Sequence, residues 1–264
     1  MFIFQTLVQT GAQSLALLVT GALVYGMTRL LRFRYQAWHF ANARASAVWG
    51  LGALALGWTV VSVLFFARAA WGGPQQALAG ERVYGPNDVI GQVVIALAAF
   101  GPAVVFMRWW REPWASARLG RHNLGKSLLV GGLLSLLIVA ASTFGVESGP
   151  SQLVAGLGRS HLWALLHYGI VGFGEEFAFR GFLQTRLASW LGRWWGWVLA
   201  AVLMALAHVV QRMTVWGLSP LEALLSSASL IPISLFQGYL MLRTENLVAP
   251  GLVHTFANWV GTLG

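Results

Sequence analysis

The stretch 162-LWALLHYGIVGFGEEFAFRGFLQTRL-187 places two adjacent carboxylates, Glu175 and Glu176, inside a long apolar run, with Arg180 about one helical turn later. A charged side chain at the centre of a membrane helix costs on the order of 2.5 to 3.5 kcal/mol on insertion scales. Two such side chains together therefore indicate a functional site. The structural alternative is an ion pair that is neutralised within the helix and only stabilises its packing.

The whole chain is apolar enough for a membrane protein. It has 264 residues, 57% of them hydrophobic and 9% charged, and its mean hydropathy is +0.67. Eight apolar runs approach the roughly 20 residues that span a bilayer. They cover Leu7–Thr28, Ala45–Ala67, Val89–Met107, Leu124–Phe144, Leu162–Leu187, Trp194–Val210, Leu221–Leu242 and Leu247–Leu263. The sequence predicts an all-α, polytopic membrane bundle of about eight transmembrane helices in a single integral-membrane domain.

Basic residues mark the sides of the membrane. The seven segments that connect the runs hold four, two, five, one, three, one and one Lys or Arg residues in chain order, which accounts for all 17. Rich and poor segments alternate through the first six, and the positive-inside rule assigns the rich ones to the cytoplasm. We therefore expect a multi-pass protein with both termini extracytoplasmic. The net charge of +9 reflects this topology, so we expect contact with membrane lipid and no nucleic-acid partner.

Several catalytic templates are missing from the sequence. The chain has no cysteine, which excludes a thiol nucleophile and thiolate metal ligands. It also lacks a G-x-S-x-G nucleophile elbow, a phosphate-binding glycine loop and an H-E-x-x-H motif. The polar groups within the apolar runs are therefore the candidates for any chemistry.

Two other apolar runs carry polar residues that can reach the acidic pair. His208 lies on the sixth run, and His254 and Asn258 lie four residues apart on the eighth, hence on one helix face. The fifth and sixth runs should form an antiparallel hairpin that turns at residues 190–193. Glu175 and His208 are almost equally far from that turn, so at about 1.5 Å per residue they should lie at one depth.

Helical geometry separates the two acidic residues. Arg180 is about 40° from Glu176 around a helix but about 140° from Glu175, so we expect Arg180 to pair with Glu176 and leave Glu175 free to act as a base.

The position expected for His254 on the last helix matches the depth of Glu175 less well. If it begins near Glu245, His254 lies about 14 Å along it, whereas Glu175 lies about 24 Å from its own turn.

These residues resemble the three motifs of the CPBP family, the CAAX prenyl protease and bacteriocin-processing (Abi-type) intramembrane endopeptidases. The segments GEEFAFRGFLQTRL, LMALAH and NLVAPGLVHTFANW carry the resemblance, which covers Val171–Val260. The family's second motif commonly has an aromatic residue four positions before the histidine, where this chain has Met204. Methionine adapts its shape, so we expect altered packing rather than lost chemistry. Residues 1–160 would then supply about four N-terminal spans, and residues 161–264 the catalytic core.

The resemblance implies a CAAX-protease-like glutamic endopeptidase that hydrolyses a peptide bond within the membrane. It implies a site made of catalytic Glu175, His208, His254 and Asn258, supported by Glu176 and Arg180. Glu175, assisted by His208, would activate a water, and this general-base help is typically worth about 10² to 10⁴ in rate. His254 and Asn258 would donate hydrogen bonds to the developing oxyanion.

Two alternatives stay open at this point. Glu175, His208 and His254 could be three ligands of a catalytic zinc, with water as the fourth, because the family has long been labelled metalloprotease. We expect no cofactor, since the spacing is not a zinc signature and Asn258 suits an oxyanion donor better. The other alternative is a non-enzymatic immunity factor or a transporter that binds a peptide or an ion with the same polar cluster.

The substrate is expected to be a peptide or protein with a membrane-associated tail or leader. Some relatives act on prenylated C-terminal tails that arrive from the cytoplasm, and others process bacteriocin leaders or C-terminal anchoring signals. The charge bias puts Glu175 and His208 nearer the extracytoplasmic leaflet, which favours the second group, in a bacterial inner membrane. The sequence fits a monomer and a dimer alike.

Overall fold

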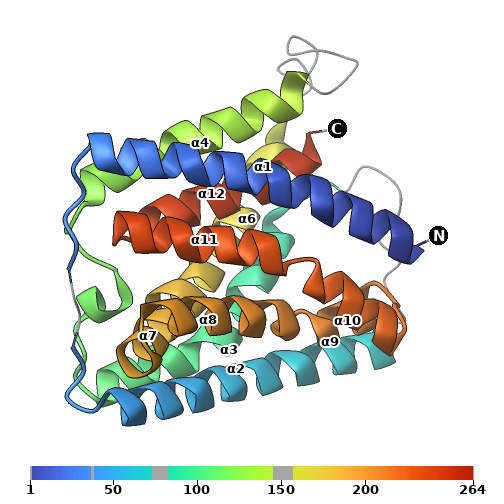
Figure 1. The fold of residues 1–264 in the computed structure, drawn as a ribbon. Helices are drawn as coiled ribbons and strands as arrows, with labels where there is room; N and C mark the ends of the chain where they lie inside the picture. The colour runs from blue at the N-terminus through green and yellow to red at the C-terminus, as the bar shows by residue number, and fades with distance from the viewer. Residues whose placement is uncertain (1, 37–38, 73–82, 145–156, 264) are drawn as a thin grey trace.

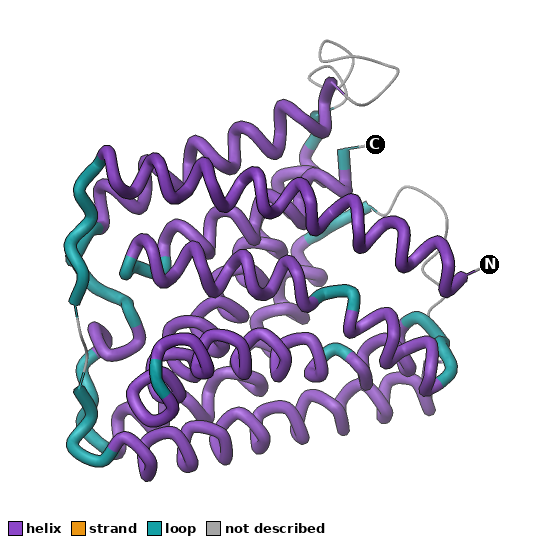
Figure 2. Tube along the Cα trace, in the orientation of Figure 1, coloured by secondary structure: helices purple, strands orange, loops and turns teal. Residues whose placement is uncertain are grey.

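The computed structural model describes residues 2–36, 39–72, 83–144 and 157–263. In this part of the chain every regular element is a helix (Figure 2). The elements are α1 (Phe2–Leu30), α2 (Ala43–Gly72), α3 (Pro86–Trp109), η1 (Trp114–Ala117), α4 (Leu124–Phe144), α6 (Arg159–Glu176), η2 (Phe177–Gln184), α7 (Thr185–Leu191), α8 (Arg193–Ala207), α9 (Val209–Val215), α10 (Pro220–Ala228), α11 (Ile231–Thr244), α12 (Val248–Trp259) and η3 (Val260–Thr262). The predicted all-α fold is confirmed.

Five helical segments of the described chain are long and apolar enough to cross a membrane, against about eight runs expected from the sequence. They cover Ala43–Ala70, Pro86–Trp109, Leu124–Thr143, Arg193–Val215 and Pro220–Thr244. Many large apolar side chains of α2, α3 and α4 are exposed, as expected for surfaces that face lipid. The chain is therefore a polytopic membrane protein. The eighth run forms only the short helices α12 and η3, which is why it falls below the length of a span.

The predicted hairpin between the fifth and sixth runs is present. Helix α7 ends at Leu191 and α8 begins at Arg193, so the turn lies within residues 190–193 as expected. Gly192 makes this turn with φ of 88°, a conformation that side chains disfavour. The hairpin brings α8 back along η2 and α7 (Figure 1).

The predicted fifth run is not one regular helix. It continues from α6 into η2, a π-helical segment whose eight residues are all buried, before α7 resumes an α-helix. Two carbonyls of this segment accept side-chain hydrogen bonds: Thr185 Oγ1 donates to Gly181 O at 2.7 Å and Arg186 Nη1 to Phe182 O at 2.8 Å. Side-chain donors thus support a backbone register that is rare in helices and frequent at functional sites.

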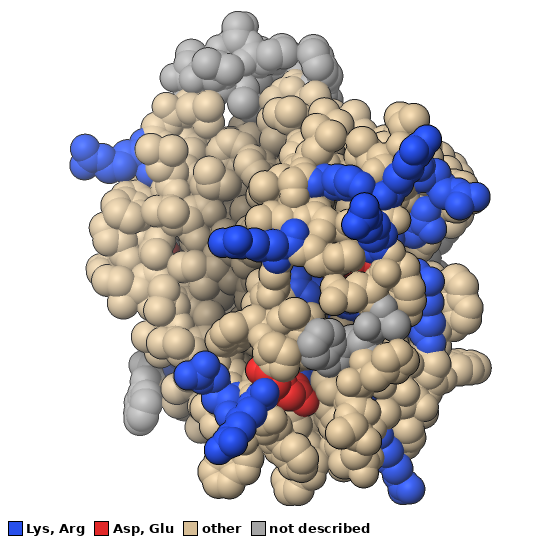
Figure 3. Space-filling view, turned by 90° about the vertical axis from the view of Figure 1, so that its left-hand side faces the viewer, with Lys and Arg blue, Asp and Glu red and all other residues tan. Residues whose placement is uncertain are grey.

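Basic loops gather at one end of the molecule, on the left of Figure 1. There Lys126 Nζ donates to Arg32 O at 2.9 Å, Arg118 Nη1 is 2.7 Å from Glu245 Oε2, and Arg193 lies over the Tyr35 ring, so the first, third, fifth and seventh connections meet. Figure 3 faces this end and shows many Lys and Arg side chains on it. We call it the basic end. The alternation of basic-rich and basic-poor connecting segments predicted that these loops lie together. The assignment of the basic end to the cytoplasm stays a prediction.

The last helix begins inside the protein rather than at its surface. Asn246 and Leu247 are buried, and Glu245 is only 5% exposed. The 118–123 loop covers them, because Leu247 N donates to Arg118 O at 3.1 Å and Asn246 Nδ2 donates to Gly120 O at 3.0 Å. Helix α12 therefore starts deeper than a surface turn.

Candidate active site

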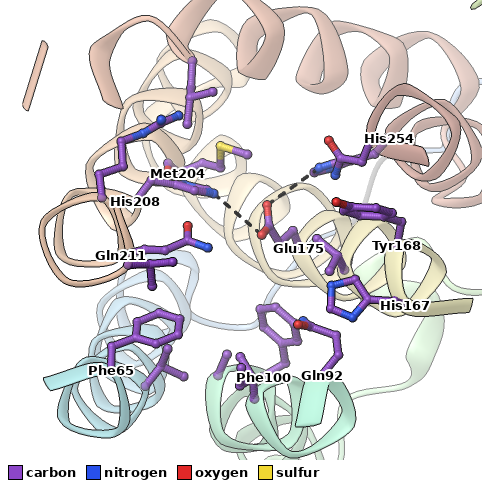
Figure 4. A pocket seen from close by; sticks show the side chains of 18 of the residues that line it. Phe65, Gln92, Phe100, His167, Tyr168, Glu175, Met204, His208, Gln211 and His254 are labelled. Atoms are coloured by element: carbon purple, nitrogen blue, oxygen red, sulfur yellow. Dashed lines mark hydrogen bonds and ion pairs between the residues drawn. The ribbon is translucent and has the colours of Figure 1, made fainter. Parts of the chain in front are cut away.

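The predicted catalytic residues meet in one place, although they come from distant parts of the chain. Glu175 lies at the end of α6, His208 at the junction of α8 and α9, and His254 on α12. Glu175 Oε1 is 3.7 Å from His208 Nε2, and Glu175 Oε2 is 3.9 Å from His254 Nε2 (Figure 4). The expectation that Glu175 and His208 lie at one depth is confirmed.

Close packing of α6 against α12 brings His254 to the acidic pair. At Gly172 an added Cβ would lie 2.6 Å from Thr255 Oγ1 and 2.8 Å from its backbone nitrogen. Any side chain at this position would push the helices apart. Because Gly172 has no side chain, the backbones of α6 and α12 can approach each other. This brings His254, which precedes Thr255 in the chain, close to the acidic pair.

Glu176 connects three helices within the protein interior. Its side chain is 0% exposed, and its Oε2 is 3.3 Å from Arg180 Nε. This confirms the predicted pairing. His254 Nδ1 is 2.8 Å from Glu176 Oε1, a contact that the sequence did not predict. Arg180 Nη2 in turn donates to Ser234 Oγ at 2.9 Å and to Ser234 O at 3.1 Å. Ser234 was missed because a lone serine on an apolar helix carries no signal in one sequence.

The hydrogen bonds of the two imidazoles define which nitrogen faces Glu175. His208 Nδ1 lies 2.9 Å from Met204 O, and because a carbonyl can only accept, Nδ1 carries the hydrogen. In neutral His208 the Nε2 atom is then an acceptor directed toward Glu175. His254 has the same arrangement, with the Glu176 carboxylate as the acceptor for Nδ1. The interaction of His208 with residue 204 uses the backbone, so it does not depend on the side chain there.

A cavity of about 710 Å³ encloses these groups. Glu175, His208, His254 and Asn258 all line it, which places the four predicted catalytic residues on one space. Residues at the ends of helices remote from the basic end line it as well, among them Arg68, Tyr84, Asp88 and Trp216. The cavity therefore extends from the carboxylate away from the basic end.

Other polar side chains of the cavity received no role from the sequence. His167, Tyr168 and Gln211 line it and surround Glu175 and His208 in Figure 4. The His167 ring is 3.2 Å from Asp88 O through Nδ1. A signal for Tyr168 was available, because it precedes Glu175 by seven residues and such residues share a helix face.

The donor set gives little support for a metal. Within the described ranges no group of three His, Cys, Asp or Glu side chains is arranged to hold a metal ion. The zinc alternative requires Glu175, His208 and His254 at about 2.0 to 2.2 Å from one point. These three do not fit such a site as they stand, so no step of the chemistry is derived through a metal.

Comparison with known proteins gave one match. Residues 157–260 match the family model described as type II CAAX prenyl endopeptidase Rce1-like. No curated protein and no solved structure matched the chain. The matched segment begins just before α6 and ends at the start of η3. It therefore contains Glu175 and Glu176 as well as His208, His254 and Asn258. Residues 157–260 are thus an Rce1-like domain of the CPBP family, and this membership implies a protease-like function within the membrane.

Proposed function

We propose that the protein is an intramembrane glutamic endopeptidase in which Glu175 and His208 activate a water and His254 and Asn258 stabilise the oxyanion. The observation that carries the proposal is the spacing around Glu175. One carboxylate faces two imidazole Nε2 atoms at 3.7 and 3.9 Å within a cavity that Asn258 also lines.

These distances are too long for direct hydrogen bonds and suit a bridging water. A donor and an acceptor about 3.6 Å or more apart do not form a hydrogen bond, and a polar contact beyond about 3.5 Å is commonly water-mediated. A water between Glu175 and His208 would donate to the carboxylate and lie ready for deprotonation. The substrate carbonyl carbon then accepts the hydroxide, and Glu175 holds the proton that the leaving amine requires.

The two proposed oxyanion donors differ in what they need. Neutral His254 has its hydrogen on Nδ1, where Glu176 accepts it, so Nε2 has none to donate. Donation from His254 therefore requires the imidazolium form, with hydrogens on both nitrogens. Asn258 donates from its amide in every protonation state. We assign the constant part of oxyanion stabilisation to Asn258 and the proton-dependent part to His254.

The shape of the cavity bears on the substrate. It extends away from the basic end, and the positive-inside rule places that end in the cytoplasm. A peptide would then reach Glu175 from the extracytoplasmic side. This favours a leader peptide or a C-terminal anchoring signal over a prenylated tail delivered from the cytoplasm, in the inner membrane of a bacterium.

The test compares the purified wild type with Glu175→Gln and His208→Ala on candidate membrane peptides. Glu222→Gln is the matched control, because it makes the same change at an exposed carboxylate outside the cavity. Circular dichroism and size-exclusion chromatography check folding. We expect cleavage by the wild type and Glu222→Gln and a loss of at least about 10² in both site variants. Full cleavage by both site variants would contradict the roles of Glu175 and His208, whereas no cleavage of any candidate peptide by the folded wild type would leave a binding or transport function.

A chelator separates the metal-free mechanism from the zinc alternative. The wild type is dialysed against a chelator, its metal content is measured, and its rate is compared before and after dialysis. The metal-free mechanism predicts an unchanged rate at a metal content far below one per chain. A rate that falls with the metal and returns with added zinc would contradict it.

A further inference from the structure

Arg212 is a buried cation on the wall of the cavity. It lies on α9 four residues after His208, is 8% exposed, and lines the same space as Glu175. Its Nε atom has no hydrogen-bond partner, and no carboxylate of the described chain forms an ion pair with it. Its guanidinium stacks on Trp216, with the carbon Cζ 4.2 Å from the ring centroid.

The other buried arginines of the described chain are neutralised. Arg180 pairs with Glu176, and Arg186 pairs with Glu112. Burying a charge without a partner is costly, so buried guanidinium groups are normally held by carboxylates. Arg212 departs from this pattern within a cavity large enough for a peptide segment. A partner supplied by a ligand would explain the departure.

The chemistry of the group defines that partner. Trp216 covers one face of the guanidinium, whereas the five N–H donors of an arginine lie in its plane and are suited to the two oxygens of a carboxylate. Asp88 and Glu175 line the same cavity, and Glu175 is flanked by His208 and His254. No carboxylate of the described residues is paired with Arg212, so a bound ligand is the partner that we consider.

We propose that Arg212 and Trp216 form a subsite that binds a carboxylate of the peptide substrate near the bond that is cut. The proposal rests on the proposed function, since His208 marks the reacting position. Four helical residues advance about 6 Å, which corresponds to about two residues of extended peptide. The carboxylate belongs to an Asp or Glu side chain or to a free C-terminus about two to three residues from the scissile bond.

A binding experiment tests this without requiring turnover. The full chain with Glu175→Gln is placed in nanodiscs of neutral phosphatidylcholine, and fluorophore-labelled apolar ten-residue peptides are titrated by anisotropy. One pair of peptides carries Glu or Gln at the same internal position, and a second pair ends in a free carboxylate or a carboxamide. The pair that shows a difference identifies which carboxylate is recognised.

We expect the acidic member of one pair to bind about tenfold to a hundredfold more tightly than its neutral counterpart. Arg212→Gln in the same background should remove the difference, and Arg212→Lys should keep part of it because the charge remains. The matched control is Arg68→Gln, an exposed arginine that lines the same cavity. It should keep the preference for the acidic peptide.

Three results would overturn the proposal. Equal binding of both members of each pair shows that no carboxylate is recognised. Equal weakening of acidic and neutral peptides by Arg212→Gln shows a structural role, and Arg212→Lys decides the same point if the glutamine variant does not fold. A preference that vanishes in phosphatidylglycerol nanodiscs, with Arg212 required for retention of that lipid, identifies a headgroup as the ligand. Peptide binding without hydrolysis by the wild type would instead contradict the proposed function and leave the subsite standing.

Discussion

The basic end and the cavity differ in how closely their buried charged groups are paired. At the basic end Arg118 Nη1 is 2.7 Å from Glu245 Oε2, and Asn246 bonds the carbonyls of Gly120 and His122. In the cavity Glu175 Oε2 has no hydrogen-bond partner and is 3.9 Å from His254 Nε2, while Glu175 Oε1 is 3.7 Å from His208 Nε2.

This difference separates groups that hold the fold from groups that are open to a ligand. Buried polar groups are normally satisfied, and an unsatisfied one in a native protein is commonly part of a functional site. At the basic end Glu245 Oε2 also lacks a hydrogen bond, but it forms a close ion pair with Arg118, so changes there should act on stability. Glu175 in the cavity has no ion pair of comparable distance, so changes there should act on activity. Each prediction below is a way to break or sharpen that division.

Glu175→Gln should have the largest effect on activity and almost none on stability. The change removes the general base, so hydrolysis should fall by about 10² to 10⁴. It also removes a buried charge that lacks a full set of partners, so the thermal unfolding temperature in detergent should stay the same or rise. Rate and melting curve are measured on one preparation. A variant that loses both would place Glu175 among the structural groups.

Glu112→Gln should show the reverse. It leaves Arg186 buried without its carboxylate, which typically costs about 3 to 5 kcal/mol. Arg186 is stacked 3.8 Å from the Phe182 ring centroid and cannot move to solvent without repacking the core. Unfolding in denaturant gives the loss, while the rate per folded molecule should be unchanged.

The double variant Glu112→Gln with Arg186→Met provides the control for this pair. Replacing both charges leaves no unpaired group, so most of the stability should return. A double variant as unstable as Glu112→Gln alone would show that the ion pair is not the cause of the loss.

Asn258→Ala should lower the rate by about 10² to 10³, because one oxyanion donor is removed. The effect should fall on kcat more than on KM, since the donor acts on charge that develops in the transition state. Gln92→Ala is the matched control, another amide that lines the cavity. If both variants lose activity equally, Asn258 only shapes the cavity.

The smallest effect concerns pH at the basic end, outside the spans. Burial raises the pKa of Glu245 above its usual value, although Arg118 opposes this, and burial likewise lowers the pKa of Arg118. Desolvation thus outweighs attraction for both partners. A carboxyl whose folded pKa is raised binds protons more readily in the folded state, so its contribution to stability falls as pH rises from the unfolded pKa through the folded one.

Unfolding curves of the wild type and Glu245→Gln across this pH range test the sign. The stability of the wild type relative to the variant should decline as pH rises above about 4.3, the ordinary glutamate value. A relative gain over the same range would mean that the Arg118 ion pair dominates.

The sequence predicted which polar residues lie together better than it predicted the shape of the helices that carry them. Polar residues in apolar runs are conspicuous, and together with the resemblance to the CPBP family they pointed to Glu175, Glu176, Arg180, His208, His254 and Asn258. The hairpin could be placed because its two runs are contiguous and its turn is short. The inference of the hairpin depends on local geometry alone.

What the sequence could not provide depends on contacts between distant segments. The contact of Glu176 with His254 depends on the close packing of α6 against α12 at Gly172. Arg212 was counted with a connecting loop, whereas it lies on α9 within a membrane-spanning segment. Its position one turn after His208 was the available signal. Roles for these residues remain predictions until the variants are measured.

The π-helical segment η2 acts as a spacer between Glu175 and the hairpin that returns His208. Each residue of an α-helix turns the chain by about 100°, so a wide turn that absorbs an extra residue resets the rotation of everything beyond it. Deleting one residue from 177–184 would turn this segment into a regular α-helix. The orientation of α7 and α8 would then change. The π-helical turn is therefore part of the alignment of the two helices: with a regular α-helix in its place, Glu175 and His208 would no longer face each other.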